Sequence, residues 1–300
     1  MMKPKDDLRK DFRLMEFNGL KLRYSNIFGV PLNEECGLIE WVHNLETFRG
    51  IVKHLHKLNG QGMENRELKK YDSHHNDPIE SKREKFTKYL LPRHPPVFYQ
   101  WFINSFHTPQ SWYQAKTAYI RTLAVMSSVG FILGLGDRHG ENILLDKSSG
   151  HAVHVDFNCL FNLGETYQYA EKVPFRLTHS MVHAMGPLGV ESGFRKCCEL
   201  TMSVLRNEMP VLMSVLRPFV YDPLVTWNKA GNTNPNAERT DSKAMANLKR
   251  IEERLEGYVK VKGKSSNIPL SVAGQVNYII KEATDVDNLA CMFIGWGSYL

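Results

Sequence analysis

The sequence has few of the features that mark several common protein classes. Its 300 residues include five cysteines, and no two of them form a Cys-x-x-Cys pair. We therefore expect neither a disulfide framework nor a zinc module, and a reducing, intracellular compartment is the default. No apolar run reaches the roughly 18 residues that a membrane-spanning helix needs. The N-terminal residues also lack the apolar segment of a signal peptide.

The chain also has only a small excess of positive over negative charge. The net charge is +6, and the basic residues are scattered apart from small clusters at 82–88 and 260–264. This pattern is typical of a solvated surface rather than of a nucleic-acid groove, so we expect no direct contact with nucleic acid and none with a membrane. Hydrophobic residues make up 42% and charged residues 23% of the chain, as in globular proteins, and the length suits one large or two ordinary domains.

Hydrophobic spacing predicts a mostly helical chain. The clearest helix begins at Ser111, its expected N-cap, and ends at Gly134, with apolar residues three and four positions apart along one stripe. Further segments are expected as helices at 45–58, 194–209, 244–257 and 270–280, as strands at 24–32 and 37–42, and as loops at 59–80, 158–178 and 228–243. We expect the last thirty-odd residues to form a compact unit of their own.

A hairpin is predicted directly after the long helix. Residues 143–146 and 152–157 read as two short strands, and Lys147-Ser-Ser-Gly150 is a suitable turn between them. The polar loop Gly134-Leu-Gly-Asp-Arg-His-Gly-Glu-Asn142 precedes this hairpin, and His154-Val-Asp-Phe-Asn158 closes it. The predicted hairpin therefore separates two segments that are rich in polar side chains.

These polar segments have the spacing of a phosphoryl-transfer site. Such a site needs a carboxylate to orient or deprotonate the incoming hydroxyl, and oxygen ligands to hold magnesium on the phosphates. Asp137 and Asn142 are five positions apart, like the catalytic Asp and the metal-binding Asn of protein kinases, and Asp156 follows the hairpin just before Phe157. Any one of these residues alone would suit a turn or a cap. Their joint spacing predicts a catalytic loop.

The order of residues within the loop indicates which class of phosphoryl-transfer enzyme the chain resembles. His139 follows Asp137 instead of preceding it, and this order is typical of the phosphatidylinositol 3-kinase-like superfamily. A histidine at this place can orient the hydroxyl, carry its proton or stabilise developing charge. A metal-dependent hydrolase that uses Asp137, His139 and Asp156 is an alternative, although such enzymes usually have more ligands than this loop supplies.

The chain resembles the C-terminal part of the phosphatidylinositol 3-kinase-related protein kinases, and among them the kinases of the DNA-damage checkpoint. The resemblance runs through the motifs at 3–11, 31–42, 90–96, 134–144, 155–161, 173–179 and 268–300. It implies an α+β, protein-kinase-like fold with a truncated small lobe. The implied parts are a partial small lobe and hinge at 1–42, a mostly helical large lobe at 43–267 and a FATC segment at 268–300. Within the large lobe, the catalytic loop is 134–142 and the activation loop 156–178.

The same resemblance implies roles for particular residues. Asp137 and His139 match the catalytic pair, and Asn142 and Asp156 match the magnesium ligands. Lys3 matches the lysine that pairs with the ATP phosphates.

Two further groups match parts of the nucleotide site. Asp7 and Asp11 lie in the acidic helix that orients the lysine. Ile39, Glu40, Trp41 and Val42 match the hinge that holds adenine.

The resemblance also implies cofactors, substrates and partners. The cofactors are ATP and Mg²⁺, or Mn²⁺ in its place. The activity is transfer of the γ-phosphate to Ser or Thr followed by Gln in protein substrates of DNA-damage and replication checkpoint signalling. The implied location is the nucleus, and regulatory partner proteins would bind the full-length kinase.

The chain departs from the family pattern in four respects, the first being a shorter segment between Phe17 and Val30. Asn158 stands where kinases usually have Gly, and Ser298 stands where the family usually has Pro. The first strands and the phosphate-covering loop of the small lobe have no counterpart, so we expect little activity from this chain alone. A non-catalytic fragment or scaffold and a phosphoinositide kinase remain alternatives. A lipid headgroup is disfavoured because the loop 158–178 offers only Lys172 and Arg176 as cations.

Overall fold

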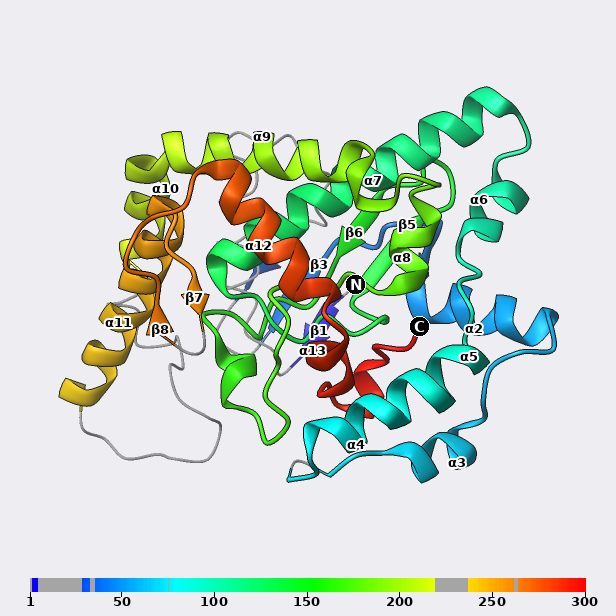
Figure 1. The fold of residues 1–300 in the computed structure, drawn as a ribbon. Coiled ribbons are helices and arrows are strands. Elements are labelled where there is room, and N and C mark those ends of the chain that lie inside the picture. Colours follow the sequence, from blue (N-terminus) through cyan, green and yellow to red (C-terminus); the bar gives the residue numbers. More distant parts are fainter. Residues whose placement is uncertain (1, 5–28, 33–35, 75, 219–236, 262–263) are drawn as a thin grey trace.

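The computed structural model describes residues 2–4, 29–32, 36–74, 76–218, 237–261 and 264–300. This part of the chain is mostly helical and contains two three-stranded sheets and one two-stranded sheet (Figure 1). The α+β character expected from the sequence is therefore confirmed. No helix among the described residues is long and apolar enough to cross a membrane.

The first sheet contains the N-terminal strands. Strands β1 (Met2–Pro4) and β2 (Gly29–Pro31) both pair antiparallel with β3 (Cys36–Ile39), which lies between them. Lys3 in β1 stands opposite Gly37 in β3. Strands β2 and β3 fall within or beside the two strands predicted for this region.

The second sheet carries the predicted hairpin. It is antiparallel, in the order β4 (Leu45–Thr47), β5 (Ile143–Asp146) and β6 (Ala152–His154). Strand β6 ends at His154 and not at 157 as predicted, because Asp156 has a φ of +57°, which a strand ladder does not accommodate. The prediction of helix at 45–47 is also wrong, because these residues pair with β5, and α2 (Phe48–Leu58) begins only after its N-cap Thr47.

The central helix is α7 (Pro109–Leu133), which is buried on nearly every side from Leu123 onward. It begins earlier than predicted. Thr108 is the N-cap, and its hydroxyl accepts the Ser111 N–H while the Ser111 hydroxyl accepts the Thr108 N–H. The helix ends as predicted at Gly134, whose φ of +64° is a left-handed cap.

Helices α7 and α9 (Gly193–Asn207) lie against each other (Figure 1). Further helices are α3 (Asn65–Leu68), α4 (Ile79–Glu84), the π-helix η2 (Lys85–Leu90), α5 (Leu91–Arg93), α6 (Tyr99–Ser105), α8 (His179–Ala184), α10 (Met209–Leu216), α11 (Ala237–Glu256), α12 (Val272–Thr284) and α13 (Val286–Ala290). Of these, α6, α10, α11 and α12 pack on the pair of α7 and α9, while α4, η2, α5 and α13 form a second group. Short 3-10 turns include η1 (Lys69–Tyr71), η3 (Leu163–Thr166), η4 (Gly189–Glu191) and η6 (Ile294–Trp296), and β7 (Lys260–Val261) pairs with β8 (Lys264–Ser265).

Several predicted loops and ends differ from these bounds. Helical turns α3 and η1 interrupt the loop predicted at 59–80, and η3 interrupts the loop predicted at 158–178. Helix α11 begins at Ala237, inside the loop predicted at 228–243, of which residues 228–236 lie outside the described part. The loop was predicted from the Asn- and Thr-rich composition, but residues 237–243 include Ala, Glu, Arg and Lys, which favour a helix.

The last thirty-odd residues do not form a separate unit as predicted, because Val276, Ile279 and Ile280 belong to the main hydrophobic core. The C-terminal tail, residues 285–300, belongs to it as well. Trp296, Tyr299 and Leu300 are buried in the same hydrophobic core as α2 and α7. Helix α13 packs against α4, and Figure 1 shows the red tail beside α4 and α5. The tail completes the core because its large apolar side chains have no core of their own to enter.

Candidate active site

The predicted catalytic loop lies between α7 and β5 and is held at both of its ends. The Gly136 N–H donates to the Cys159 carbonyl at 2.7 Å, and the Arg49 N–H at the start of α2 donates to the Gly140 carbonyl at 2.8 Å. An added Cβ at Gly140 would lie 3.0 Å from the Arg49 Cβ. The loop therefore packs closely on α2 and on the segment after β6.

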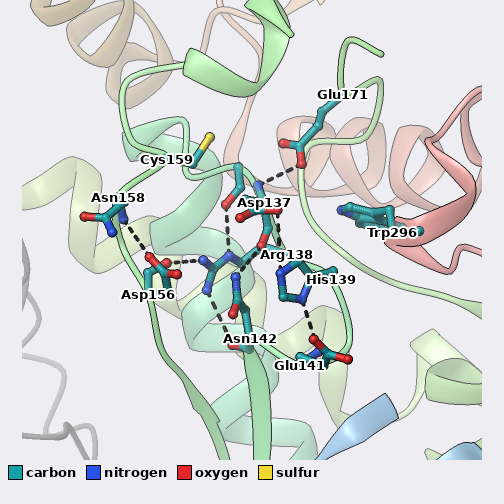
Figure 2. Close-up of polar contacts among 12 residues, drawn as sticks. Asp137, Arg138, His139, Glu141, Asn142, Asp156, Asn158, Cys159, Glu171 and Trp296 are labelled. Atoms are coloured by element: carbon teal, nitrogen blue, oxygen red, sulfur yellow. Dashed lines mark hydrogen bonds and ion pairs between the residues drawn. The ribbon is translucent and has the colours of Figure 1, made fainter. Parts of the chain in front are cut away.

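The buried guanidinium of Arg138 joins this loop to the segment that follows the hairpin. It donates to the Gly136 carbonyl at 3.0 Å, to the Val155 carbonyl at 2.7 Å and to the Asp156 carbonyl (Figure 2). The Val155 N–H in turn donates to the Asn142 carbonyl at 3.1 Å. These bonds place the backbones that carry Asn142 and Asp156 next to each other.

Both aspartates of the site have strained backbones. Asp137 and Asp156 each have a φ of +57°, in the left-handed region that few residues other than Gly adopt. Such a conformation persists only where surrounding contacts hold it, and it is common at functional sites. The Asp137 N–H donates to Glu171 Oε1 at 2.7 Å, and the Asp156 carboxylate accepts the Asn158 N–H at 3.4 Å.

Asn142 is oriented by the catalytic loop itself. Its Nδ2 donates to the Asp137 carbonyl at 2.9 Å, so its Oδ1 points away from that carbonyl (Figure 2). An amide oxygen and the Asp156 carboxylate are hard ligands of the kind that Mg²⁺ takes when phosphates supply the others. The described residues contain no group of three His, Cys, Asp or Glu side chains able to hold a metal.

His139 is oriented toward the Asp137 carboxylate. Its Nδ1 accepts the Glu141 N–H at 3.2 Å, so the ring proton of the neutral imidazole is on Nε2, which lies 3.8 Å from Asp137 Oδ1. This distance exceeds that of a hydrogen bond and leaves both groups available to a third one between them. The structure thus brings together the four residues predicted for catalysis and metal binding.

Burial tunes the acidity of the site. It raises the pKa of Asp137 above its usual range, and the nearby Asp156 carboxylate acts in the same direction, while His139 and Arg138 oppose both. A carboxylate with a raised pKa is a stronger base, so it can better accept a proton from a hydroxyl.

Glu171 is a site residue that the sequence did not reveal. Besides accepting the Asp137 N–H, it lies so close to Gly136 and Gly164 that an added Cβ on either glycine would come within 2.4 Å of its Oε2. Burial raises the pKa of Glu171 to about 7. A single acidic residue in a loop does not predict such contacts. The only sequence signal is that Gly136 and Gly164 lack a Cβ and so allow another group to approach closely.

The residues predicted to bind the nucleotide are described less completely. Asp7 and Asp11 lie outside the described residues, and for Lys3 the structure describes the backbone in β1. The predicted hinge 39–42 begins at the last residue of β3 and leads toward β4, which pairs with the β5 strand of the predicted hairpin. Trp41 is 64% exposed, so its ring is accessible to a ligand instead of being a core residue.

Three features define a kinase of the phosphoinositide-kinase-like class. They are a loop with Asp137 in the left-handed region, Asn142 and Asp156 on either side of a hairpin, and a mostly helical large unit. Family comparison identifies the class. The model described as phosphatidylinositol 3- and 4-kinase matches residues 1–229, and the FATC domain model matches residues 269–300. The chain therefore belongs to the phosphatidylinositol 3- and 4-kinase family and carries a FATC domain.

Individual relatives narrow the relationship within that family. The chain is 53% identical over 314 residues to the serine/threonine-protein kinase ATR of Drosophila melanogaster and 46% identical over 316 residues to protein kinase rad3 of Schizosaccharomyces pombe. Both alignments include the whole chain but only 12% and 13% of those relatives. A solved structure, the FAT and kinase domain of CtTel1, matches the whole chain at 31% identity with a TM-score of 0.84, and the chain covers 21% of it. The resemblance to the phosphatidylinositol 3-kinase-related protein kinases is confirmed.

Proposed function

We propose that this chain is the catalytic part of a serine/threonine-protein kinase of the checkpoint type. It would transfer the γ-phosphate of ATP to Ser or Thr in protein substrates, with Gln following the acceptor, and act in the nucleus with regulatory partner proteins. Relatives that match the whole chain are named as serine/threonine-protein kinases, which supports the reaction class.

The arrangement of Asp137, Asn142 and Asp156 is the observation that carries this proposal. Asp137 has the raised pKa of a base, and His139 Nε2–H faces its carboxylate. The substrate hydroxyl would lie between these two groups, so that Asp137 accepts its proton while His139 stabilises the charge that develops. Arg138 makes the arrangement rigid, because it bonds to carbonyls on both sides of the site.

Asn142 and Asp156 fit a divalent cation, either Mg²⁺ or Mn²⁺. When bound, the ion would neutralise the phosphate oxygens and align the nucleotide. The exposed ring of Trp41 would stack on adenine, with Ile39, Glu40 and Val42 lining the hinge. Lys3 would pair with the ATP phosphates, and Asp7 and Asp11 would orient that lysine.

Charge in the activation loop favours a protein substrate over a phosphoinositide. Of the two cations in residues 158–178, Arg176 is 1% exposed and bonds to the carbonyls of Trp296 and Gly297. Only Lys172 remains exposed in this loop, and one lysine offers little to a phosphorylated headgroup.

The test is Mg²⁺- and ATP-dependent phosphorylation of a Ser-Gln peptide by the full-length protein that carries this sequence. We expect transfer by the wild type, none by Asp137→Ala or Asp156→Ala, and weaker transfer to a matched Ser-Ala peptide. Glu84→Ala, a change at an exposed carboxylate of α4, serves as the control and should be fully active. Full activity of Asp156→Ala would refute the proposed site, and phosphorylation of phosphatidylinositol instead of the peptide would refute the substrate class.

A further inference from the structure

The tail residue Trp296 contacts two residues of the activation loop that reach the catalytic loop from different sides. The Arg176 guanidinium stacks on the Trp296 ring, 4.4 Å from its centroid. The Trp296 indole lies beside the Glu171 carboxylate (Figure 2), where its N–H lowers the pKa of that carboxyl without forming a hydrogen bond of normal geometry. Trp296 is itself 5% exposed, so these contacts are inside the protein.

Glu171 holds the N-terminal side of the dipeptide Asp137–Arg138. Its Oε1 accepts the N–H of Asp137 at 2.7 Å, at the residue whose φ is +57°. Gly136 and Gly164 approach the same carboxylate so closely that a Cβ on either would collide with its Oε2. A buried acceptor that is this tightly enclosed fixes the direction of the N–H bond, and with it the strained conformation of Asp137.

Arg176 contacts the C-terminal side of the same dipeptide, at the Arg138 carbonyl. Its Nη1 donates to the Trp296 carbonyl at 2.8 Å and reaches the Arg138 carbonyl at 3.5 Å, while its Nη2 donates to the Gly297 carbonyl at 2.7 Å. Backbone carbonyls and the faces of Phe48 and Trp296 carry the interactions of Arg176. Its planar fork therefore joins the tail to the catalytic loop by geometry.

We propose that Glu171 and Arg176 are positioning residues for the phosphoryl transfer, and that Trp296 holds both in place. Glu171 fixes the N–H of Asp137, Arg176 fixes the carbonyl of Arg138, and together they keep the Asp137 carboxylate aimed at the substrate hydroxyl. This inference rests on the proposed function for its catalytic consequence, but the restraint on the loop is a property of the fold alone.

Two measurements on the full-length protein test it. The first is hydrogen exchange in peptides covering 135–142, which Glu171→Ala and Trp296→Ala should accelerate by about tenfold or more, since an open loop loses its protection. The second is steady-state phosphorylation of the Ser-Gln peptide. Glu171→Ala should lower kcat by about 10²-fold with the KM values for ATP and peptide unchanged, because only the alignment of the reacting group is lost.

Conservative and control variants separate positioning from folding. Glu171→Gln retains an oxygen acceptor for the Asp137 N–H and should recover most of kcat, whereas Arg176→Lys loses the planar fork and should not. Phe293→Ala is the matched control, because Phe293 also joins tail to activation loop, through Tyr169 at 5.3 Å between ring centroids, without reaching the catalytic loop. It should leave both exchange and kcat unchanged.

The outcomes that overturn the inference are distinct from those that overturn the function. Unchanged exchange at 135–142 in folded Glu171→Ala would refute the restraint, and a raised peptide KM with unchanged kcat would assign Glu171 to substrate binding instead. If wild type and Phe293→Ala both fail to transfer phosphate, the proposed function fails, and the exchange measurement still decides whether the restraint exists.

Discussion

At the scale of single residues, the site depends on buried charged groups that bond to backbone. Arg138 is 3% exposed and Arg176 is 1% exposed, and both donate to carbonyls. Such a group is costly to bury unless its donors are satisfied, so it holds the surrounding carbonyls strongly once they are in place. The positive φ of Asp137 and Asp156 persists because these donors fix the backbone at and around each aspartate.

Glu171 leads to a prediction about stability and pH. Its pKa of about 7 in the folded protein lies above the usual value of a carboxyl, so folding favours the protonated form. The stabilisation from this group is therefore complete below about pH 4.5 and is lost as pH rises through about 7. Glu171→Gln should remove this loss and gain about 2–3 kcal/mol on wild type between pH 5 and pH 8, as measured by chemical unfolding.

The control for this prediction is a glutamate of the same loop. Glu165 is an exposed partner of Arg250 and Lys260, and Glu165→Gln should change the free energy of unfolding by no more than about 1 kcal/mol. The Asp137 carboxylate itself raises the pKa of Glu171, so the difference between the two proteins includes this interaction. Parallel pH curves for wild type and Glu171→Gln would contradict the account.

At the scale of elements, the β5–β6 hairpin presents the site. The turn residue Gly150 has a φ of +76°, and an added Cβ would lie 2.6 Å from the Ala115 carbonyl of α7. Gly150→Ala should therefore combine backbone strain with a clash and lower the free energy of unfolding by about 2–4 kcal/mol. Gly60→Ala is the matched control, because Gly60 has a φ of +65° and nothing within 4 Å, so only the strain of about 1 kcal/mol applies. Equal losses would show that the hairpin does not pack closely on α7.

The sequence predicts elements best where local signals agree. The hairpin turn and the Gly134 cap follow from residue types that favour them, and both were correctly placed. The start of α7 was misplaced because Thr108 and Ser111 are both good caps and form a mutual pair, which only the structure resolves. Strand β4 was missed because its pairing with β5 joins residues about a hundred positions apart along the chain.

At the scale of the whole molecule, the C-terminal tail is part of one cooperative core. Leu300 is 1% exposed, and Leu300→Ala should lower the free energy of unfolding by about 2–5 kcal/mol. Ile268, at 73% exposure just before α12, is the control, and Ile268→Ala should change stability by no more than about 0.5 kcal/mol. A single unfolding transition shifted by Leu300→Ala is expected, and separate melting of the tail would contradict this view.

Contacts between residues far apart along the chain could not be predicted from the sequence. The spacing of Asp137, Asn142 and Asp156 predicted the centre of the site because the hairpin between them is local. The roles of Glu171 and Arg176 were missed because each depends on contacts to residues distant along the chain, Asp137 for Glu171 and Trp296 for Arg176. Motif spacing therefore predicts what chemistry a loop can do, while the packing of distant segments decides how firmly the loop is held.

The central claim is that Asp156 and Asn142 hold a divalent cation beside Asp137, and a change of metal preference tests it most directly. Asp156→Cys replaces a hard oxygen ligand with a soft thiolate, which favours Cd²⁺ over Mg²⁺. We expect Asp156→Cys to transfer no phosphate with Mg²⁺ and to regain transfer when Cd²⁺ is added, whereas Glu141→Cys, at a neighbouring exposed carboxylate, keeps its Mg²⁺-dependent activity. Full Mg²⁺-dependent activity of Asp156→Cys would contradict the account.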